Sequence, residues 1–365
     1  MTNTDIRPFR IDIPQADLDD LMARLERTRL PRPAPGDSWE HGTPNHYLAE
    51  AVEAWRRFDW RAAEERINAH PHFMAEIDGQ PLHFIHVKST NPDATPLLLG
   101  HTYPGSSVDY LDVIDKLTDA FHLVIPDAPG FGFSNPVPDG GWNAARVARA
   151  YDTLMRRLGY DSYGMHGSDN GAVVARELGL LAPEGFLGLH VLQLFSFPSG
   201  DPAEFEHLEP ADYAGLEFMK WFQKVGGYNT MNASRPQTIA AALSDSPVGL
   251  LAYSELFNSF GNGTSLVPLE TIILEASVAW FTNAAAGMSR AYFDNAAADE
   301  PTPVSDAPTG VAVFADDFRT IRAFAERDNS NIVHWSHFER GGHFAALEVP
   351  ELVADDIRTF FAKRR

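Results

Sequence analysis

The sequence predicts an α/β protein built on a mostly parallel β-sheet with helices on both faces. Short apolar runs, typical of buried strands, alternate with amphipathic stretches, typical of helices. Strands that alternate with helices indicate a parallel sheet covered on both sides. The predicted strands are 96–101, 121–127, 162–168, 186–195, 308–316 and 331–340.

Helical patterns connect these strands. The stretch 147–160 places Val147, Tyr151, Leu154 and Leu158 on one face. A second helix begins at Gly171, and a third covers 348–364 after the last strand. The alternation stops over 198–302, which is mostly helical and rich in aromatic residues and alanine. A helical block inserted between strands predicts a cap over the strand ends, where the sites of open α/β sheets lie.

The chain before the first of these strands has a different organisation. Residues 15–29 predict an amphipathic helix, 46–69 are helical again, and a hairpin with its turn at Asp78-Gly79 follows. The Pro- and Gly-rich stretch 30–44 predicts neither helix nor strand. We therefore divide the chain into an N-terminal wrapping segment, an α/β core in two pieces and a helical cap. These are residues 1–80, residues 81–197 with 303–365, and residues 198–302.

Composition narrows the class of protein. A net charge of −21 over 365 residues argues against nucleic acid and anionic membrane surfaces as partners. The absence of cysteine excludes disulfides, thiolate catalysis and cysteine metal sites. With no apolar run of about 18 residues, we expect a soluble, cytoplasmic protein. Histidines such as His70, His72 and His101 lack metal-ligand spacing on a helix, so we expect neither metal nor organic cofactor.

The stretch MHGSDNGAVVAREL, residues 165–178, has the strand–turn–helix setting of the nucleophile elbow in the α/β-hydrolase fold. Such a turn brings strand and helix so close that the residues two positions either side of the nucleophile must be small. Asp169 has Gly167 and Gly171 there, whereas Ser168 has a histidine and an asparagine. Asp169 is therefore the predicted nucleophile. The alternative is that Asp169 only caps the following helix.

Other strand ends supply the remaining groups that this fold needs. The loop after strand 96–101 and the residue after the nucleophile offer backbone N–H groups for an oxyanion hole, here those of Tyr103 and Asn170. His343 lies in a glycine loop before the last helix, where the base is expected. Asp316 and Asp317 both end the preceding strand and both qualify as the acid that orients it.

With these residues in place, almost the whole chain resembles an epoxide hydrolase of the microsomal type in its soluble bacterial form. The similar segments are 9–31 and 58–87 near the N-terminus, RPQTIAAALSDSPVGLLAY in the cap (235–253), and 331–361. The resemblance implies Asp169 as nucleophile and His343 as base. It favours Asp317 over Asp316, because the family's acid stands three residues after a strand-ending Phe, here Phe314.

The resemblance also implies that two cap tyrosines, Tyr228 and Tyr292, bind the epoxide oxygen. Asp169 would open the ring to form an ester, and water activated by His343 and Asp317 would hydrolyse it to a vicinal diol without a cofactor. A carboxylate suits this reaction, because water cleaves an ester but not the ether that a serine would form.

Two single positions and the cap stretch SELFNSFGNGTS (254–265) depart from the family pattern. Thr102 stands where a glycine is usual, and Asn170 where tryptophan is frequent. We expect them to alter the substrate range, towards a bulky or specialised epoxide such as one from secondary metabolism. A haloalkane dehalogenase, a serine esterase and a non-catalytic binding protein on the same fold are the alternatives. A homodimer is also expected.

Overall fold

The computed structural model describes residues 6–206, 208–258, 266–298 and 303–364. Its strands form one sheet in the order β1-β2-β3-β5-β4-β6-β7-β8-β9. The strands are β1 (Ile6–Phe9), β2 (His72–Ile77), β3 (Gln80–Val87), β4 (Thr95–Gly100), β5 (Phe121–Pro126), β6 (Tyr163–Gly167), β7 (Phe186–Val191), β8 (Thr309–Asp316) and β9 (Ile332–Gly342). The helices up to the cap are α1 (Gln15–Glu26), α2 (Asn45–Arg57), α3 (Trp60–Ile67), η2 (Ser107–Tyr110), α4 (Leu111–Leu117), α5 (Ala144–Arg157) and α6 (Asn170–Leu181). Those after β7 are α7 (Pro210–Val225), α8 (Gly227–Ser234), α9 (Pro236–Asp245), α10 (Pro247–Tyr253), α11 (Leu269–Phe281), α12 (Ala285–Ala296), α13 (Arg322–Asp328), α14 (Ala345–Glu348) and α15 (Pro350–Phe361).

The sheet confirms the predicted fold class. The pairs β1–β2, β2–β3 and β3–β5 are antiparallel, and every pair from β5 through β4 to β9 is parallel. Leu97 to Gly100 of β4 pair in register with Gly164 to Gly167 of β6. The loops that leave these two strands therefore start side by side, at the edge where the carboxyl ends of the parallel strands meet.

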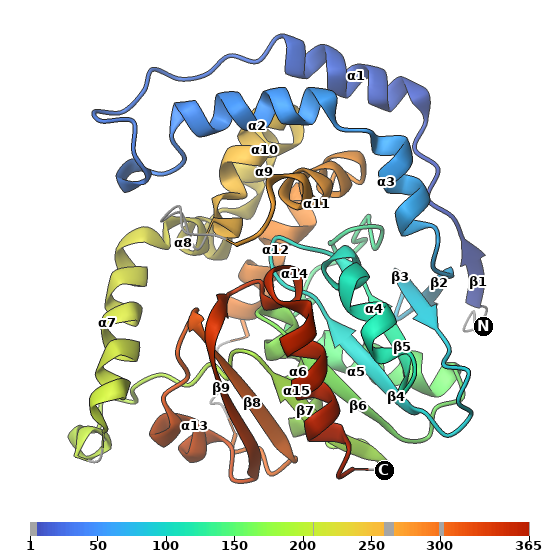
Figure 1. Cartoon of the computed structure of the whole chain (residues 1–365), viewed down its shortest axis with the longest axis vertical. Helices are drawn as coiled ribbons and strands as arrows, with labels where there is room; N and C mark the ends of the chain where they lie inside the picture. The colour runs from blue at the N-terminus through green and yellow to red at the C-terminus, as the bar shows by residue number, and fades with distance from the viewer. Residues whose placement is uncertain (1–5, 207, 259–265, 299–302, 365) are drawn as a thin grey trace.

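Helices cover both faces of the sheet (Figure 1). On one face, Val147, Tyr151 and Leu154 of α5 are buried with apolar residues of α6, as the helical pattern predicts. On the other face α4 packs against α15. Each face of the sheet thus buries its own apolar layer, which makes the sheet a rigid base for the loops at its edge.

The helices α7 to α12 lie between β7 and β8 along the chain, within the predicted cap. The N-terminal helices α1 and α2 extend across this block (Figure 1) and contact α10 and α11. Arg24 of α1 forms an ion pair with Asp245 at 3.1 Å, and the indole N–H of Trp55 donates to Ser277 Oγ at 2.8 Å. The division into three parts stays a proposal, and its boundary at residue 302 lies outside the described residues.

The structure differs from the sequence prediction at a few elements. The stretch 46–69 forms two helices, because Asp59 caps a new helix by accepting the Ala62 N–H at 3.1 Å. The short edge strand β1 was not predicted, and the irregular stretch 30–44 contains a 3₁₀ turn at Trp39–His41. The predicted strand 186–195 ends at Val191. The hairpin of β2 and β3, with its turn at Asp78-Gly79, agrees with the prediction.

Candidate active site

Asp169 lies on the tight turn between β6 and α6. Its φ of 49° and ψ of −113° are strained for a residue with a side chain. A Cβ atom on Gly167 would lie 2.2 Å from the Gly171 oxygen, and one on Gly171 would lie 2.1 Å from the Gly100 oxygen. Only glycine fits at both positions, so the small residues of the motif follow from the close approach of β4, β6 and α6.

The Asp169 carboxylate has a fixed orientation. The Tyr103 N–H donates to its Oδ2 at 2.8 Å, and its Oδ1 lies 3.7 Å from Nε2 of His343. Asn170 is the first residue of α6, so its N–H belongs to the helix-initial N–H groups that have no partner within the helix. Within the described residues, the Tyr103 N–H, and not the Asn170 N–H, forms a hydrogen bond to this carboxylate.

The two candidate acids occupy different environments. Asp317 is 2% exposed, and its Oδ1 lies 2.7 Å from Nδ1 of His343. Asp316 ends β8 opposite Gly342 and is exposed. Burial disfavours the imidazolium of His343, but the negative charges of Asp317 and Asp169 outweigh burial and raise the pKa of His343 to about 10. The resting site therefore has a charged histidine between two carboxylates.

Gln193, just after β7, is a site residue that the sequence analysis did not find. Its Oε1 accepts the Asp169 N–H at 2.7 Å and the Ser168 hydroxyl at 3.2 Å, while its Nε2 donates to Oδ2 of Asp317. One amide thus connects the Asp169 turn to Asp317. The available signal was a single polar residue within the apolar run VLQLF at a strand end.

Tyr228 on α8 and Tyr292 on α12 lie close to each other. Their ring centroids are 6.0 Å apart, and the Tyr103 ring packs against both, at 5.8 Å and 4.8 Å. The two hydroxyls lie within hydrogen-bonding reach of each other. Burial raises the pKa of both tyrosines well above the usual value, and the negative charge of Asp169 raises it further. Both phenols are therefore protonated donors at neutral and moderately alkaline pH.

A cavity of about 660 Å³ connects these groups. Asp169, His343, Tyr228 and Tyr292 line it, and the rest of its wall is mainly apolar. The aromatic residues in that wall are Phe195, Phe197, Phe218, Phe222 and Phe318. A cavity of this size accommodates a ligand of many heavy atoms, held mostly by apolar contact.

One group of described residues has the geometry of a metal-ligand cluster, namely His190, His334 and Asp356. Their atoms are paired with one another, because the two imidazole Nε2 atoms contact the Asp356 carboxylate at 2.9 and 2.8 Å. None of the three lines the cavity of Asp169. The histidines His70, His72 and His101 do not belong to this group.

An aspartate on a tight strand–helix turn, a histidine with its own carboxylate, and a helical block over the strand ends define the class of the protein, a hydrolase-type site on an α/β sheet. Family models agree: "alpha/beta hydrolase fold" matches residues 95–270, and "Epoxide hydrolase N terminus" matches residues 6–110. The chain is 38% identical to a putative epoxide hydrolase of Stigmatella aurantiaca, over 99% of this chain and 86% of that protein. It is 31% identical to epoxide hydrolase 1 of Sus scrofa, over 97% and 88% respectively. The chain belongs to the epoxide hydrolase family.

Solved structures agree with this assignment. The juvenile hormone epoxide hydrolase of the silkworm Bombyx mori superposes with a TM-score of 0.92 at 25% identity, covering 99% of this chain and 95% of that one. The epoxide hydrolase of Aspergillus niger gives 0.87 at 30% identity, covering 99% and 97%. Within the part of the chain that the structure describes, no helix is both long and apolar enough to cross a membrane.

Proposed function

We propose that this protein hydrolyses an epoxide to a vicinal diol through a covalent ester on Asp169. One observation carries the proposal: an ionisable carboxylate and two tyrosine hydroxyls line the same cavity, with His343 beside the carboxylate. A nucleophile and a pair of proton donors converging on one space suit a three-membered ring, which needs attack at carbon and protonation at oxygen. The aromatic wall favours epoxides with a bulky, mainly apolar substituent.

In the first step, Oδ1 of Asp169 attacks a ring carbon, a carbon–oxygen ester bond forms and the ring carbon–oxygen bond breaks. Tyr228 and Tyr292 donate hydrogen bonds to the departing oxygen, which takes a proton from a tyrosine. The tyrosine regains its proton from His343 through solvent. Oδ2 is the remaining ester oxygen and keeps its hydrogen bond from the Tyr103 N–H.

Ester formation changes His343 from an acid into a base. The ester has no charge, so the contribution of Asp169 to the raised pKa of His343 disappears and this pKa falls, which makes the neutral imidazole easier to reach while Asp317 still orients it. His343 removes a proton from water, which attacks Cγ of Asp169. The Tyr103 N–H, joined by that of Asn170, stabilises the oxyanion on Oδ2. The intermediate then collapses: the bond between Cγ and the ester oxygen breaks, and the departing oxygen takes the proton from His343 to give the diol. The second proton of the water passes to His343 as the Asp169 carboxylate re-forms.

The alternative of a haloalkane dehalogenase shares the aspartate and histidine. It needs side-chain N–H donors for the halide, commonly a tryptophan after the nucleophile, and Asn170 stands there. The paired tyrosines also favour an epoxide oxygen as the group that is protonated. The homodimer and the cytoplasmic location remain predictions from the sequence, and light scattering after size-exclusion chromatography tests the first.

The decisive experiment is intact mass spectrometry of the H343Q variant with a panel of aryl and alkyl epoxides and haloalkanes. Removing the base stalls the second step, so we expect a mass gain of one whole epoxide, mapped to Asp169. The double variant D169G/H343Q is the matched control and should gain no mass. A gain equal to a haloalkane less its hydrogen halide would establish the dehalogenase instead, and no adduct with any compound would contradict both.

A further inference from the structure

Two buried carboxyl groups lie beside the loop after β4, whose Tyr103 N–H binds the Asp169 carboxylate. Asp109 on η2 is 1% exposed, and Glu275 on α11, within the proposed cap, is 2% exposed. Neither forms an ion pair with an arginine or lysine among the described residues. The two carboxyl groups are hydrogen-bonded to each other. Two carboxylates this close in a buried site cannot both be charged, so at least one is protonated.

The remaining hydrogen bonds show how the pair is arranged. Oδ2 of Asp109 accepts the Thr102 N–H at 2.9 Å and the Thr102 hydroxyl at 2.8 Å, and Oε2 of Glu275 accepts the Ser106 hydroxyl at 2.9 Å. Oδ1 of Asp109 and Oε1 of Glu275 have no donor among the described protein groups. A proton on one of the two carboxyl groups, shared with the other, would give these oxygen atoms a hydrogen bond.

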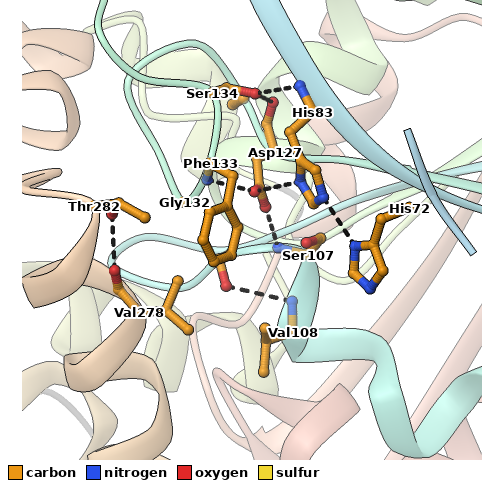
Figure 2. A network of polar contacts seen from close by, with 12 residues as sticks. His72, His83, Ser107, Val108, Asp127, Gly132, Phe133, Ser134, Val278 and Thr282 are labelled. Atoms are coloured by element: carbon orange, nitrogen blue, oxygen red, sulfur yellow. Dashed lines mark hydrogen bonds and ion pairs between the residues drawn. The ribbon is translucent and has the colours of Figure 1, made fainter. Parts of the chain in front are cut away.

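Neighbouring charges decide which carboxyl group has the proton. Asp127 is ionised: although burial works against the charge, the contact with His83 and other hydrogen bonds lower its pKa to about 2. Figure 2 shows Asp127 accepting the Ser107 N–H beside His83, a hydrogen bond of 2.7 Å. Burial and the charges of Asp109 and Asp127 raise the pKa of Glu275 well above its usual value. Burial also raises the pKa of Asp109, but His101 and the two Thr102 donors act in the opposite direction, so the proton belongs on Glu275.

We propose that Glu275 is a neutral carboxylic acid whose O–H, donated to Asp109, positions the Thr102–Tyr103 backbone so that the Tyr103 N–H remains on the Asp169 carboxylate. The chain of contacts is continuous: Glu275 binds Asp109, Asp109 binds the Thr102 N–H, and the next N–H along the backbone is that of Tyr103. Glu275 and Asp109 are thus positioning residues. The hydrogen bond to Asp109 also gives the Thr102 hydroxyl a positioning role, which a glycine at this position could not have.

The protonation state has a test that does not depend on any substrate. At pH 8 the infrared spectrum of the protein should contain the C=O band of a protonated carboxylic acid, absent from E275Q. The control is E348Q, because burial raises the pKa of Glu348 only to about 6 and it should be ionised at pH 8. The same band in E275Q as in the wild type would overturn the assignment of the proton.

The positioning role is tested by hydrogen exchange at the Tyr103 amide. E275Q keeps a donor for Asp109, so the amide should stay as protected as in the wild type, whereas E275L should exchange at least roughly tenfold faster. T102V, compared with T102S, removes only the Thr102 hydroxyl contact and should show a smaller change in the same direction. Equal protection in E275L and E275Q would overturn the proposal.

The kinetic test rests on the proposed function. In E275L the hydrolysis of the Asp169 ester should slow by roughly tenfold to a hundredfold, because an oxyanion donor is displaced. Ring opening should slow less than ester hydrolysis, so the ester should accumulate in the steady state, and E275Q should behave like the wild type. E275L hydrolysing the ester at the wild-type rate would contradict the proposal. If the wild type forms no ester with any epoxide, the proposed function fails, and the exchange and infrared results still decide the positioning role.

Discussion

Nε2 of His343 lies 3.7 Å from Oδ1 of Asp169, too far for an ordinary hydrogen bond. A serine nucleophile needs a close base because its hydroxyl must lose a proton as it attacks. A carboxylate is already ionised and needs none. The spacing therefore suits a histidine that acts only after the ester has formed, on a water molecule that approaches Cγ.

Replacing Asp169 separates its chemistry from its backbone strain. We expect both D169G and D169A to lose turnover completely, because neither has a carboxylate. Glycine adopts a φ of 49° without strain and alanine does not, so D169G should be about 1 kcal/mol more stable than D169A after allowing for the greater chain entropy of glycine. Urea denaturation and an epoxide assay measure the two effects. Residual turnover in D169G would contradict the proposed nucleophile.

The paired tyrosines should act on ring opening alone. In Y228F/Y292F the departing oxygen has no donor, and we expect the single-turnover rate of ester formation to fall by roughly a hundredfold or more. Each single variant should lose less, because one donor remains. Hydrolysis of an ester formed in advance should be nearly unchanged. Near-normal ring opening in the double variant would show that these hydroxyls have another role.

The charge of His343 makes a pH-dependent contribution to stability. Its folded pKa of about 10 lies above the unfolded value of about 6.5, so the protonated form stabilises the fold. The contribution is complete below about pH 6.5 and disappears as the pH rises towards 10. The stability difference between wild type and H343Q, measured in urea, should therefore be larger at pH 6 than at pH 10. A difference that grows with pH would show that the histidine is neutral in the resting protein.

Gln193 should be important for both stability and activity. Q193L leaves the Asp169 N–H and Oδ2 of Asp317 without the partner they have now, which should cost about 2 kcal/mol or more. Q193E keeps an acceptor for the N–H but places a second negative charge beside Asp317. We expect both variants to be less stable and less active than the wild type, as measured by urea midpoint and kcat. Wild-type values in both would leave Gln193 without a positioning role.

Much of the fold could be predicted because its signals are local. The strands that became β4, β5 and β8 are mainly apolar runs of the expected length, and the elbow motif places β6 and Asp169 with its flanking glycines. The division of 46–69 into two helices was missed, since it depends on how a single aspartate, Asp59, caps a helix. The edge strand β1 has only four residues and one pairing partner, which leaves little periodic pattern to detect.

The site was predictable only where a motif or the family resemblance pointed to it. Tyr228 and Tyr292 lie in helices with no local motif, and only the resemblance singled them out. Gln193 and Asp317 are 124 positions apart, and no periodicity links them. The pair of Asp109 and Glu275 likewise joins η2 to α11, a contact that depends on how the helices from 210 to 296 pack on the sheet.

The contact of α1 and α2 with α10 and α11 has a consequence for how the protein is made. Trp55 is 222 positions from Ser277, and Arg24 is 221 from Asp245. A ribosome that adds about 5–20 residues per second needs on the order of 10–40 s to deliver those partners. During that interval the apolar faces of the first two helices, with Leu21, Leu25 and Trp55, lack the cap helices that help to cover them in the finished fold. We therefore expect the nascent chain, and not the finished protein, to be the form that depends on chaperones.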